Sequence, residues 1–239
     1  MLYLIGLGLN KQGISKEGIF AIEKCDKVYL ENYTIDFPYD VDKLGLDETT
    51  IKLARGDVES NRLIKEAKEE DIALLVYGSP LFATTHISLI LEAKKAGVKT
   101  RVIYSASIFD AIAETGLQLY KFGKISSMPT WTKNNKPDSF LDFVKQNQLI
   151  KAHSLILVDI GLSLEGALKQ LEQASKKKKI KLNKLLICNK MGTKKASIFY
   201  GQISKLKKLK IKSPFCFIIP GDMHFLEKEF VESFEADEK

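Results

Sequence analysis

The stretch IALLVYGSP, residues 72–80, decides the fold class. Its first five residues are all apolar, which is typical of a strand that is covered on both faces in a parallel sheet. Glycine and proline then end the strand, and a helical spacing of apolar residues runs from about Thr85 to Ala96. Because a buried strand followed by a helix is the repeating unit of α/β proteins, we expect an α/β fold.

The same alternation extends outward in both directions. Further strands are predicted over residues 2–5, 27–30, 50–54, 98–103, 154–160, 185–189, 197–200 and 215–219. Helices are predicted from about Ser15, which suits an N-cap, and over residues 58–69, 107–114, 140–148 and 223–234. One more helix carries an apolar face made of Leu164, Ala167, Leu168, Leu171 and Ala174. The pattern indicates a parallel or mixed sheet.

A chain of 239 residues can form one large domain or two small ones. The composition shifts towards Ser, Pro, Asn and Lys over residues 124–139. We place the domain boundary near Ser105. This gives an N-terminal α/β domain over residues 1–104 and a C-terminal α/β domain over residues 105–239.

The formal charge of +7 comes almost entirely from lysine, since the arginines are only Arg55, Arg62 and Arg101. Recognition of phosphate or guanine by paired hydrogen bonds favours arginine, so we do not expect nucleic acid as a partner. The lysine runs at residues 176–179 and 205–212 are interpreted as solvated loop and helix faces.

Cysteine and histidine give no sign of a metal site or a disulfide framework. Cys25, Cys188 and Cys216 are odd in number and stand in apolar surroundings. The three histidines are far apart in the sequence and match no metal-ligand spacing. We therefore expect no metal.

The N-terminal residues MLYLI, 1–5, have no basic region before them and meet glycine at once, so they read as a strand and not as a signal peptide. No apolar run approaches the ~20 residues that cross a bilayer. We expect a cytoplasmic protein without a membrane partner.

Three loops could hold a ligand, because each follows a predicted strand and open α/β sheets bind ligands at the carboxyl ends of strands. Residues 6–9, GLGL, permit a sharp turn but lack the third glycine of a nicotinamide fingerprint. Residues 78–86, GSPLFATTH, either offer backbone donors, hydroxyls and an apolar wall to an adenosine-like ligand, or form a turn in which Thr84 or Thr85 caps the helix. Residues 105–108, SASI, hold either an N-cap serine or a ligand contact.

Several segments, in the same order over nearly the whole chain, resemble those of the diphthine synthases, a family of the tetrapyrrole-methylase class. They are LYLIGLGL at 2–9, LENYT at 30–34, PLFATTH at 80–86, SI at 107–108, GLQLYKFG at 116–123, WT at 131–132, KPDSF at 136–140, LVDI at 157–160, and PG at 220–221 with His224. The segments ATTH and GLQLY are together the most specific.

The resemblance implies two α/β domains with a cofactor cleft between them, and a homodimer. It implies that the cofactor is S-adenosyl-L-methionine and that the substrate is translation elongation factor 2, on which the amino group of a modified histidine is methylated. By position in the matching motifs, the cofactor contacts would be Leu9, Ser79, Phe82, Ser107, Ile108, Val158, Met191 and Phe215. The donor's sulfonium is already a leaving group, so the site needs no nucleophile, and no catalytic residue is assigned.

Two departures from the family pattern stand in these motifs. Ser79 replaces the aspartate of a usual Gly-Asp-Pro, so a hydroxyl stands where a carboxylate acceptor is expected. The segment NKMG, residues 189–192, replaces a typical Ala-Arg-x-Gly and loses a bidentate donor.

Other functions remain open at this point. A methylase of the same fold could act on a tetrapyrrole or RNA, although GLQLY and KPDSF favour the diphthine synthases. A nicotinamide-dependent oxidoreductase would need the missing glycine. A noncatalytic ribosome-associated module would use the lysine faces and bind no adenosine cofactor. Within the diphthine synthase reading, the sequence leaves open whether three methyl groups are added on nitrogen or a fourth on a carboxylate.

Overall fold

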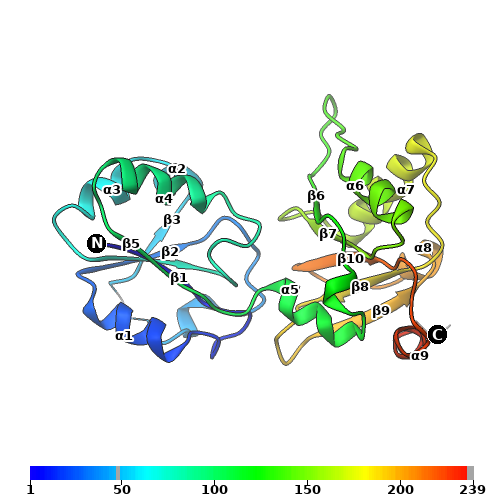
Figure 1. Cartoon of the computed structure of the whole chain (residues 1–239), viewed down its shortest axis with the longest axis horizontal. Coiled ribbons are helices and arrows are strands. Elements are labelled where there is room, and N and C mark those ends of the chain that lie inside the picture. The colour runs from blue at the N-terminus through cyan, green and yellow to red at the C-terminus, as the bar shows by residue number, and fades with distance from the viewer. Residues whose placement is uncertain (47–48, 236–239) are drawn as a thin grey trace. The chain divides into compact units, whose positions relative to one another are not determined.

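The computed structural model describes residues 1–46 and 49–235. The chain forms two compact units, Met1–Ile108 and Phe109–Lys239, each built on one five-stranded sheet (Figure 1). The units divide between Ile108 and Phe109, whereas the sequence analysis placed the boundary between residues 104 and 105. The α/β fold class predicted from the sequence is confirmed.

The first sheet is entirely parallel and has the order β3-β2-β4-β1-β5. Its strands are β1 (Leu2–Gly6), β2 (Lys27–Glu31), β3 (Ile51–Leu53), β4 (Ile72–Val76) and β5 (Thr100–Ile103). Figure 1 shows α1 (Lys16–Lys24) on one face and α2 (Arg55–Val58), α3 (Arg62–Glu66) and α4 (His86–Lys95) on the other. Because all strands run in the same direction, their carboxyl ends lie at one edge of the sheet.

The central strand β4 shows why the stretch at 72–80 decides the fold. All five residues of β4 are buried. Ile72, Leu74 and Val76 pack into the core on the side of α3 and α4, and Ala73 and Leu75 pack into the core on the other face. Alternating side chains of a strand point to opposite faces, so an unbroken apolar run is what a doubly covered strand requires.

The helix predicted over residues 58–69 is wrong in its bounds, since the structure has the short helices α2 and α3 there. Between them the Ser60 hydroxyl donates a hydrogen bond to the backbone carbonyl of Asp57 and accepts one from the backbone N–H of Arg62. Serine side chains compete in this way for backbone groups, and the continuous helix is interrupted. The helix predicted over 107–114 is also shorter, with α5 (Ile108–Ala111) followed by a 3-10 turn, Ile112–Thr115.

The second sheet is mixed and has the order β6-β7-β10-β8-β9, in which only β6 and β7 are parallel. Its strands are β6 (Ser126–Met128), β7 (Ser154–Val158), β8 (Leu185–Asn189), β9 (Ser197–Gly201) and β10 (Phe215–Ile219). The helices are α6 (Phe140–Leu149), α7 (Leu164–Lys178), α8 (Ile203–Leu206) and α9 (Phe225–Glu232), and 3-10 turns span Leu119–Lys121 here and Val41–Lys43 in the first unit.

The apolar face predicted for α7 is confirmed, because all five of its residues are buried in the core of the second unit. Helices α6 and α7 lie together on one side of that sheet (Figure 1). Strand β6 and helix α8 were not predicted, since each is too short to carry a recognisable period. Within the described residues, no helix has the length and apolar character needed to span a membrane.

Candidate functional site

Three loops meet at the carboxyl edge of the first sheet. The loops after β1 and β4 are joined by a pair of backbone hydrogen bonds, from Gly8 N–H to Gly78 O at 3.1 Å and from Gly78 N–H to Gly8 O at 3.0 Å. The loop after β5 is tied in by Ser105, whose hydroxyl donates to the carbonyl of Gly13 at 2.7 Å. The three candidate segments of the sequence therefore form one structured edge of the first unit.

The glycines of this edge allow the loops to approach one another. A Cβ atom on Gly6 would lie 2.6 Å from the carbonyl oxygen of Gly78 and 3.0 Å from Ser105. Gly8 has a φ of +66°, and its Cβ would meet the Ser105 hydroxyl at 2.8 Å. The sequence analysis explained these glycines by a sharp turn and a ligand, and the structure adds that contact between loops requires them.

The loop after β4 is held in one conformation; we call residues 79–85 the proline loop. The N–H of Phe82 donates to the Ser79 carbonyl at 3.1 Å, and Ala83 has a left-handed φ of +55°. The hydroxyl of Thr84 donates back to the Pro80 carbonyl at 2.6 Å. Thr85 occupies the N-cap position of α4, but its side chain makes no cap hydrogen bond. Neither threonine therefore caps the helix through its hydroxyl.

Four of the predicted cofactor contacts lie on these loops, and a fifth, Ile108, is the first residue of α5. Leu9 and Ser107 are buried, and Ser79, Phe82 and Ile108 are half-buried. None of the five is charged, so the edge offers backbone groups, hydroxyls and apolar side chains. This donor set fits an adenosine-like cofactor better than a phosphate-rich one, for which basic side chains are expected.

The other three predicted contacts share one edge of the second sheet. Val158 ends β7, Phe215 begins the antiparallel strand β10, and Met191 follows the end of β8. Phe215 pairs with Asn189, and the N–H of Lys190 donates to the carbonyl of Pro214 at 3.0 Å. Met191 and Phe215 are buried, whereas Val158 is half-buried.

The segment that departs from the family pattern, residues 189–192, has a structural role of its own. The Asn189 amide donates to the carbonyls of Lys212 and Pro214 at 2.7 and 2.9 Å. Lys190 adopts a left-handed φ of +48°. The asparagine thus joins the chain before β10 to the end of β8.

Sequence reasoning missed a buried ion pair beneath the proline loop. The Nε2 atom of His86 lies 2.5 Å from Oε2 of Glu31, and neither side chain is more than 2% exposed. Burial by itself lowers the pKa of the His86 imidazole, but the hydrogen bond and charge of Glu31 outweigh it, so the net direction of the pKa is upward. The available signal was a glutamate that closes the largely apolar strand KVYLE, residues 27–31.

A second missed centre is the carboxylate of Glu227 in the other unit. It accepts hydrogen bonds from the backbone N–H groups of Gln118 and His224, at 2.9 and 2.7 Å, and it forms an ion pair with Lys121. Burial raises its pKa, but the Gln118 N–H, the Lys121 amine, the His224 N–H and His153 together lower the pKa to about 2. Glu227 thereby holds the GLQLYK and PGDMH segments together.

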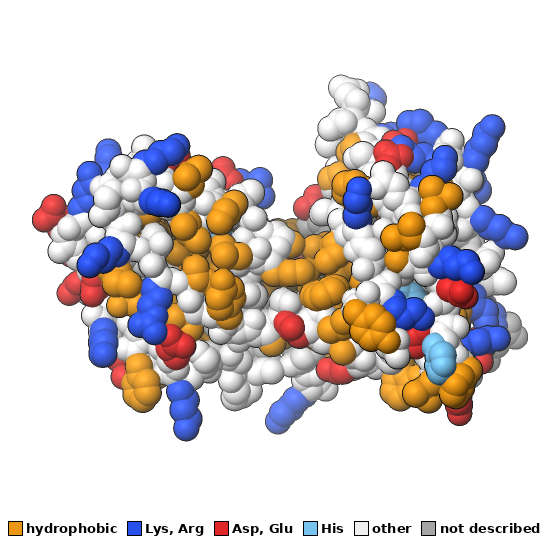
Figure 2. Space-filling model, viewed as in Figure 1, with side chains coloured by type: hydrophobic (Ala, Val, Ile, Leu, Met, Phe, Trp, Pro, Cys, Tyr) orange, Lys and Arg blue, Asp and Glu red, His pale blue; other side chains and the backbone are white. Residues whose placement is uncertain are grey.

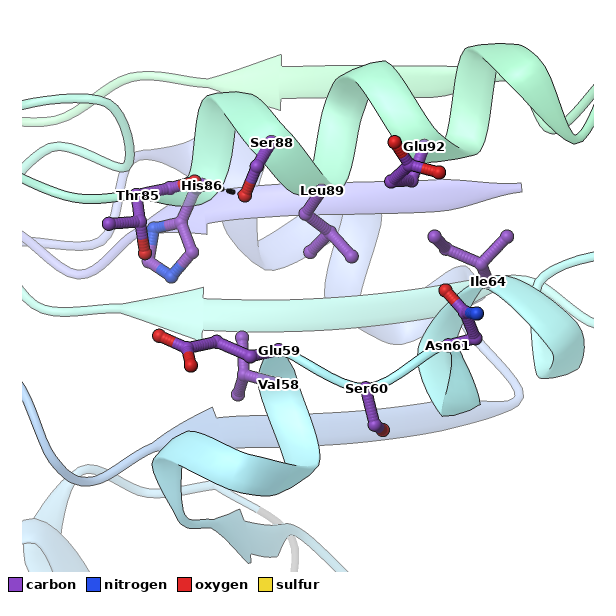
Figure 3. Close-up of a pocket in the computed structure, with 10 residues that line it drawn as sticks. All are labelled: Val58, Glu59, Ser60, Asn61, Ile64, Thr85, His86, Ser88, Leu89 and Glu92. Atoms are coloured by element: carbon purple, nitrogen blue, oxygen red, sulfur yellow. Dashed lines mark hydrogen bonds between the residues drawn. The ribbon is translucent and has the colours of Figure 1, made fainter.

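Neither a metal nor the small pocket of Figure 3 explains these residues. Within residues 1–46 and 49–235, no three or more His, Cys, Asp or Glu side chains are grouped so that they could hold a metal ion. The pocket of Figure 3 lies between α4 and the turn that joins α2 to α3, and the His86 ring points into it. Its volume of about 50 Å³ suits water and not an adenosine.

Lysines of both lysine runs pair with acidic side chains. On the side shown in Figure 2, Lys and Arg side chains are interspersed with acidic and uncharged ones on both units. Lys177 and Lys178, from one of the lysine runs, pair with Asp138, and Lys207, from the other, pairs with Glu172.

The chain matches the family model described as Tetrapyrrole (Corrin/Porphyrin) Methylases over residues 1–207. It is 36% identical to a diphthine synthase of Methanococcus vannielii, a match that covers 96% of each chain. It is also 36% identical to a diphthine methyl ester synthase of Dictyostelium discoideum, over 99% of this chain and 98% of that protein. A crystal structure of a diphthine synthase is similar with a TM-score of 0.88 at 30% identity, covering 98% of this chain and 95% of that one.

Proposed function

The chain belongs to the tetrapyrrole (corrin/porphyrin) methylase family and is a methyltransferase, and from this premise we propose that it is a diphthine synthase that uses S-adenosyl-L-methionine. The acceptor is the amino group of the aminocarboxypropyl arm on a histidine of translation elongation factor 2. The observation that carries the proposal is the full-length likeness to diphthine synthases, with the candidate loops gathered at one sheet edge.

The proposed cofactor contacts are those predicted from the sequence. In the first unit they are Leu9, Ser79, Phe82, Ser107 and Ile108, and in the second Val158, Met191 and Phe215. The uncharged character of this set supports recognition of an adenosine and a methionine chain through backbone groups and apolar contact. S-adenosylmethionine supplies a methyl group on a sulfonium, which leaves without further activation.

The protein has two tasks: to align the acceptor amine with the methyl carbon of the cofactor, and to remove water from the amine. An amine attacks only as the neutral base, and burial of an amine favours that form. Alignment of the amine with the methyl carbon converts an encounter of two molecules into a reaction within one complex, which lowers the barrier by several kcal/mol. No side chain is assigned as a general base.

We also propose a homodimer in the cytoplasm, in line with the family resemblance. The relative from Methanococcus vannielii is named a diphthine synthase, and the relative from Dictyostelium discoideum a diphthine methyl ester synthase. We propose the class of reaction, and the mass of the product gives the number of methyl groups transferred.

Two measurements test the proposed function. Calorimetry should detect binding of S-adenosylmethionine or its demethylated product but not of NAD, and binding of NAD alone would refute a methyltransferase of this kind. The protein is then incubated with elongation factor 2 that carries the precursor modification and with an isotopically labelled methyl donor. Three methyl groups in the product mass indicate the nitrogen-only reaction and a fourth indicates the ester. Parallel incubations offer a tetrapyrrole or RNA in place of the elongation factor, and transfer only to one of these would identify a relative with another acceptor.

A further inference from the structure

We propose that Glu31 and His86 form a positioning pair, which holds the proline loop in the conformation that receives the cofactor. The inference rests on the proposed function, because that function assigns Ser79 and Phe82 of this loop to the cofactor. Neither Glu31 nor His86 touches the cofactor in this proposal; both act through Pro80.

The hydrogen bonds fix which atoms of His86 carry protons. Its Nδ1 atom lies 2.9 Å from the carbonyl oxygen of Pro80. A carbonyl only accepts, so Nδ1 must donate. The Nε2 atom of His86 lies 2.5 Å from Oε2 of Glu31, so the other side of the ring is in direct contact with the carboxyl group. His86 therefore links strand β2 to the proline loop, through its contact with Glu31 on one side and its hydrogen bond to Pro80 on the other.

Pro80 is the residue of the proline loop that His86 contacts. Its carbonyl accepts from His86 and also from the hydroxyl of Thr84. Between these contacts Ala83 holds a left-handed φ, which costs about 1–2 kcal/mol for a residue with a side chain. Such a conformation persists only when surrounding contacts determine it, and these two hydrogen bonds to Pro80 act there together with the bond from the Phe82 N–H to the Ser79 carbonyl.

The pair has no substitute within the described part of the chain. Both carboxylate oxygens of Glu31 and the Nε2 atom of His86 are buried and have no hydrogen-bond partner there, so the 2.5 Å contact between Oε2 and Nε2 is what compensates the carboxylate. Glu59 and Glu92 line the pocket beside His86, but they are acidic and cannot replace His86 as the partner of Glu31 (Figure 3). Loss of either partner therefore leaves a buried polar group unpaired.

Three variants separate positioning from general stability. Glu31→Leu leaves Nε2 of His86 without its partner. Glu31→Leu with His86→Leu removes both polar groups, and a buried ion pair replaced by apolar residues often restores stability. Glu31→Gln keeps a polar partner for His86 but removes the charge. Ile64→Val serves as the control, because Ile64 lines the same pocket from α3 and loses only buried apolar volume (Figure 3).

Two readouts are taken on each folded variant, together with its melting temperature. The first is hydrogen exchange of the proline-loop peptide without cofactor, which follows the Phe82 N–H bonded to Ser79. The second is the dissociation constant of S-adenosylmethionine by calorimetry. We expect Glu31→Leu and the double variant to exchange faster and to bind about tenfold more weakly, the effect of losing one hydrogen bond to a charged group. Glu31→Gln should stay within about threefold of the wild type, and Ile64→Val should change neither readout.

The decisive comparison is the double variant. If its melting temperature recovers while its loop exchange and affinity stay impaired, the pair positions the loop. If affinity and exchange recover together with stability, or if Ile64→Val impairs both to the same degree, the pair is merely structural and the inference is wrong. A wild-type chain that fails to bind S-adenosylmethionine overturns the proposed function, whereas unchanged loop exchange in every variant overturns this inference alone.

Discussion

The Nε2 atom of His153 lies 3.3 Å from Oε1 of Glu227, and its Nδ1 atom accepts a hydrogen bond from the N–H of Gly221 at 2.8 Å. Nδ1 must therefore be unprotonated, and Nε2 carries the hydrogen. Burial lowers the pKa of His153, and the hydrogen bond to Glu227 opposes this only in part, so the imidazole stays neutral. His86 is held in the opposite way, because its Nδ1 donates to a carbonyl and the net direction of its pKa is upward.

Glu227→Gln should destabilise the protein by up to about 3 kcal/mol at pH 6, since the pKa of this carboxyl is lowered from 4.5 to about 2 in the fold. A lowered pKa contributes stability above the unfolded-state value. That contribution is lost as the pH falls through about 2. Urea unfolding should therefore show a gap between variant and wild type that is full at pH 6 and closes from pH 4.5 towards pH 2. Glu229→Gln, at an exposed position of the same helix, is the control, and a gap independent of pH would contradict the assignment.

Gly6→Ala should lower the unfolding free energy by about 1–3 kcal/mol, because the new Cβ would overlap backbone atoms of the neighbouring loops. It should also weaken binding of S-adenosylmethionine, since the loops after β1, β4 and β5 would have to separate. Gly56→Ala is the matched control. A Cβ at Gly56, in α2, meets nothing within 4 Å, and alanine should raise stability by up to about 1 kcal/mol. Equal behaviour of both variants would mean that the loops adjust freely.

Ser79→Ala should weaken cofactor binding only threefold to tenfold, because one neutral hydrogen bond contributes about 0.5–1.5 kcal/mol. Ser79→Asp, which restores the residue usual in the family, should be tolerated if the loop binds chiefly through backbone groups. Calorimetry on both variants, after circular dichroism has verified folding, checks this. A larger loss in Ser79→Ala would show that the hydroxyl is a principal contact.

Phe82→Asp should nearly abolish cofactor binding, because it places a charge against a half-buried apolar wall. The same calorimetric titration measures it, and comparison with Ser79→Asp separates the effect of shape from that of charge. If folded Phe82→Asp protein bound the cofactor as well as the wild type does, the proline loop would be only a connection between strand and helix.

Light scattering over a range of concentrations should give the mass of a dimer, twice 26.9 kDa. This prediction rests on the family resemblance, since apolar periodicity does not distinguish a core from an interface. A monomer at every concentration would show that the family's quaternary structure does not carry over.

The family resemblance read from the motifs is confirmed by the matches to diphthine synthases over nearly the whole chain. Several elements were also predictable from local signals. Ser15 caps α1 through a hydrogen bond from the N–H of Gly18, as its residue type indicates. The proposed site residues could be named only because their motifs match a known pattern, and within each unit they lie at or beside one edge of the sheet.

By itself, the sequence determined the buried strand β4, the apolar face of α7 and the family. These follow from interactions within a few residues, or from motifs whose order is written along the chain. Only the tertiary structure decided that Glu31 contacts His86. It also decided that position 6 requires glycine, because the carbonyl oxygen of Gly78 lies where a Cβ atom would clash with it. Those residues come into contact through the order β2-β4-β1 of the first sheet. That order is set by long-range packing of whole strands and helices. The residues next to Glu31 or Gly6 in the sequence carry no local pattern that predicts it.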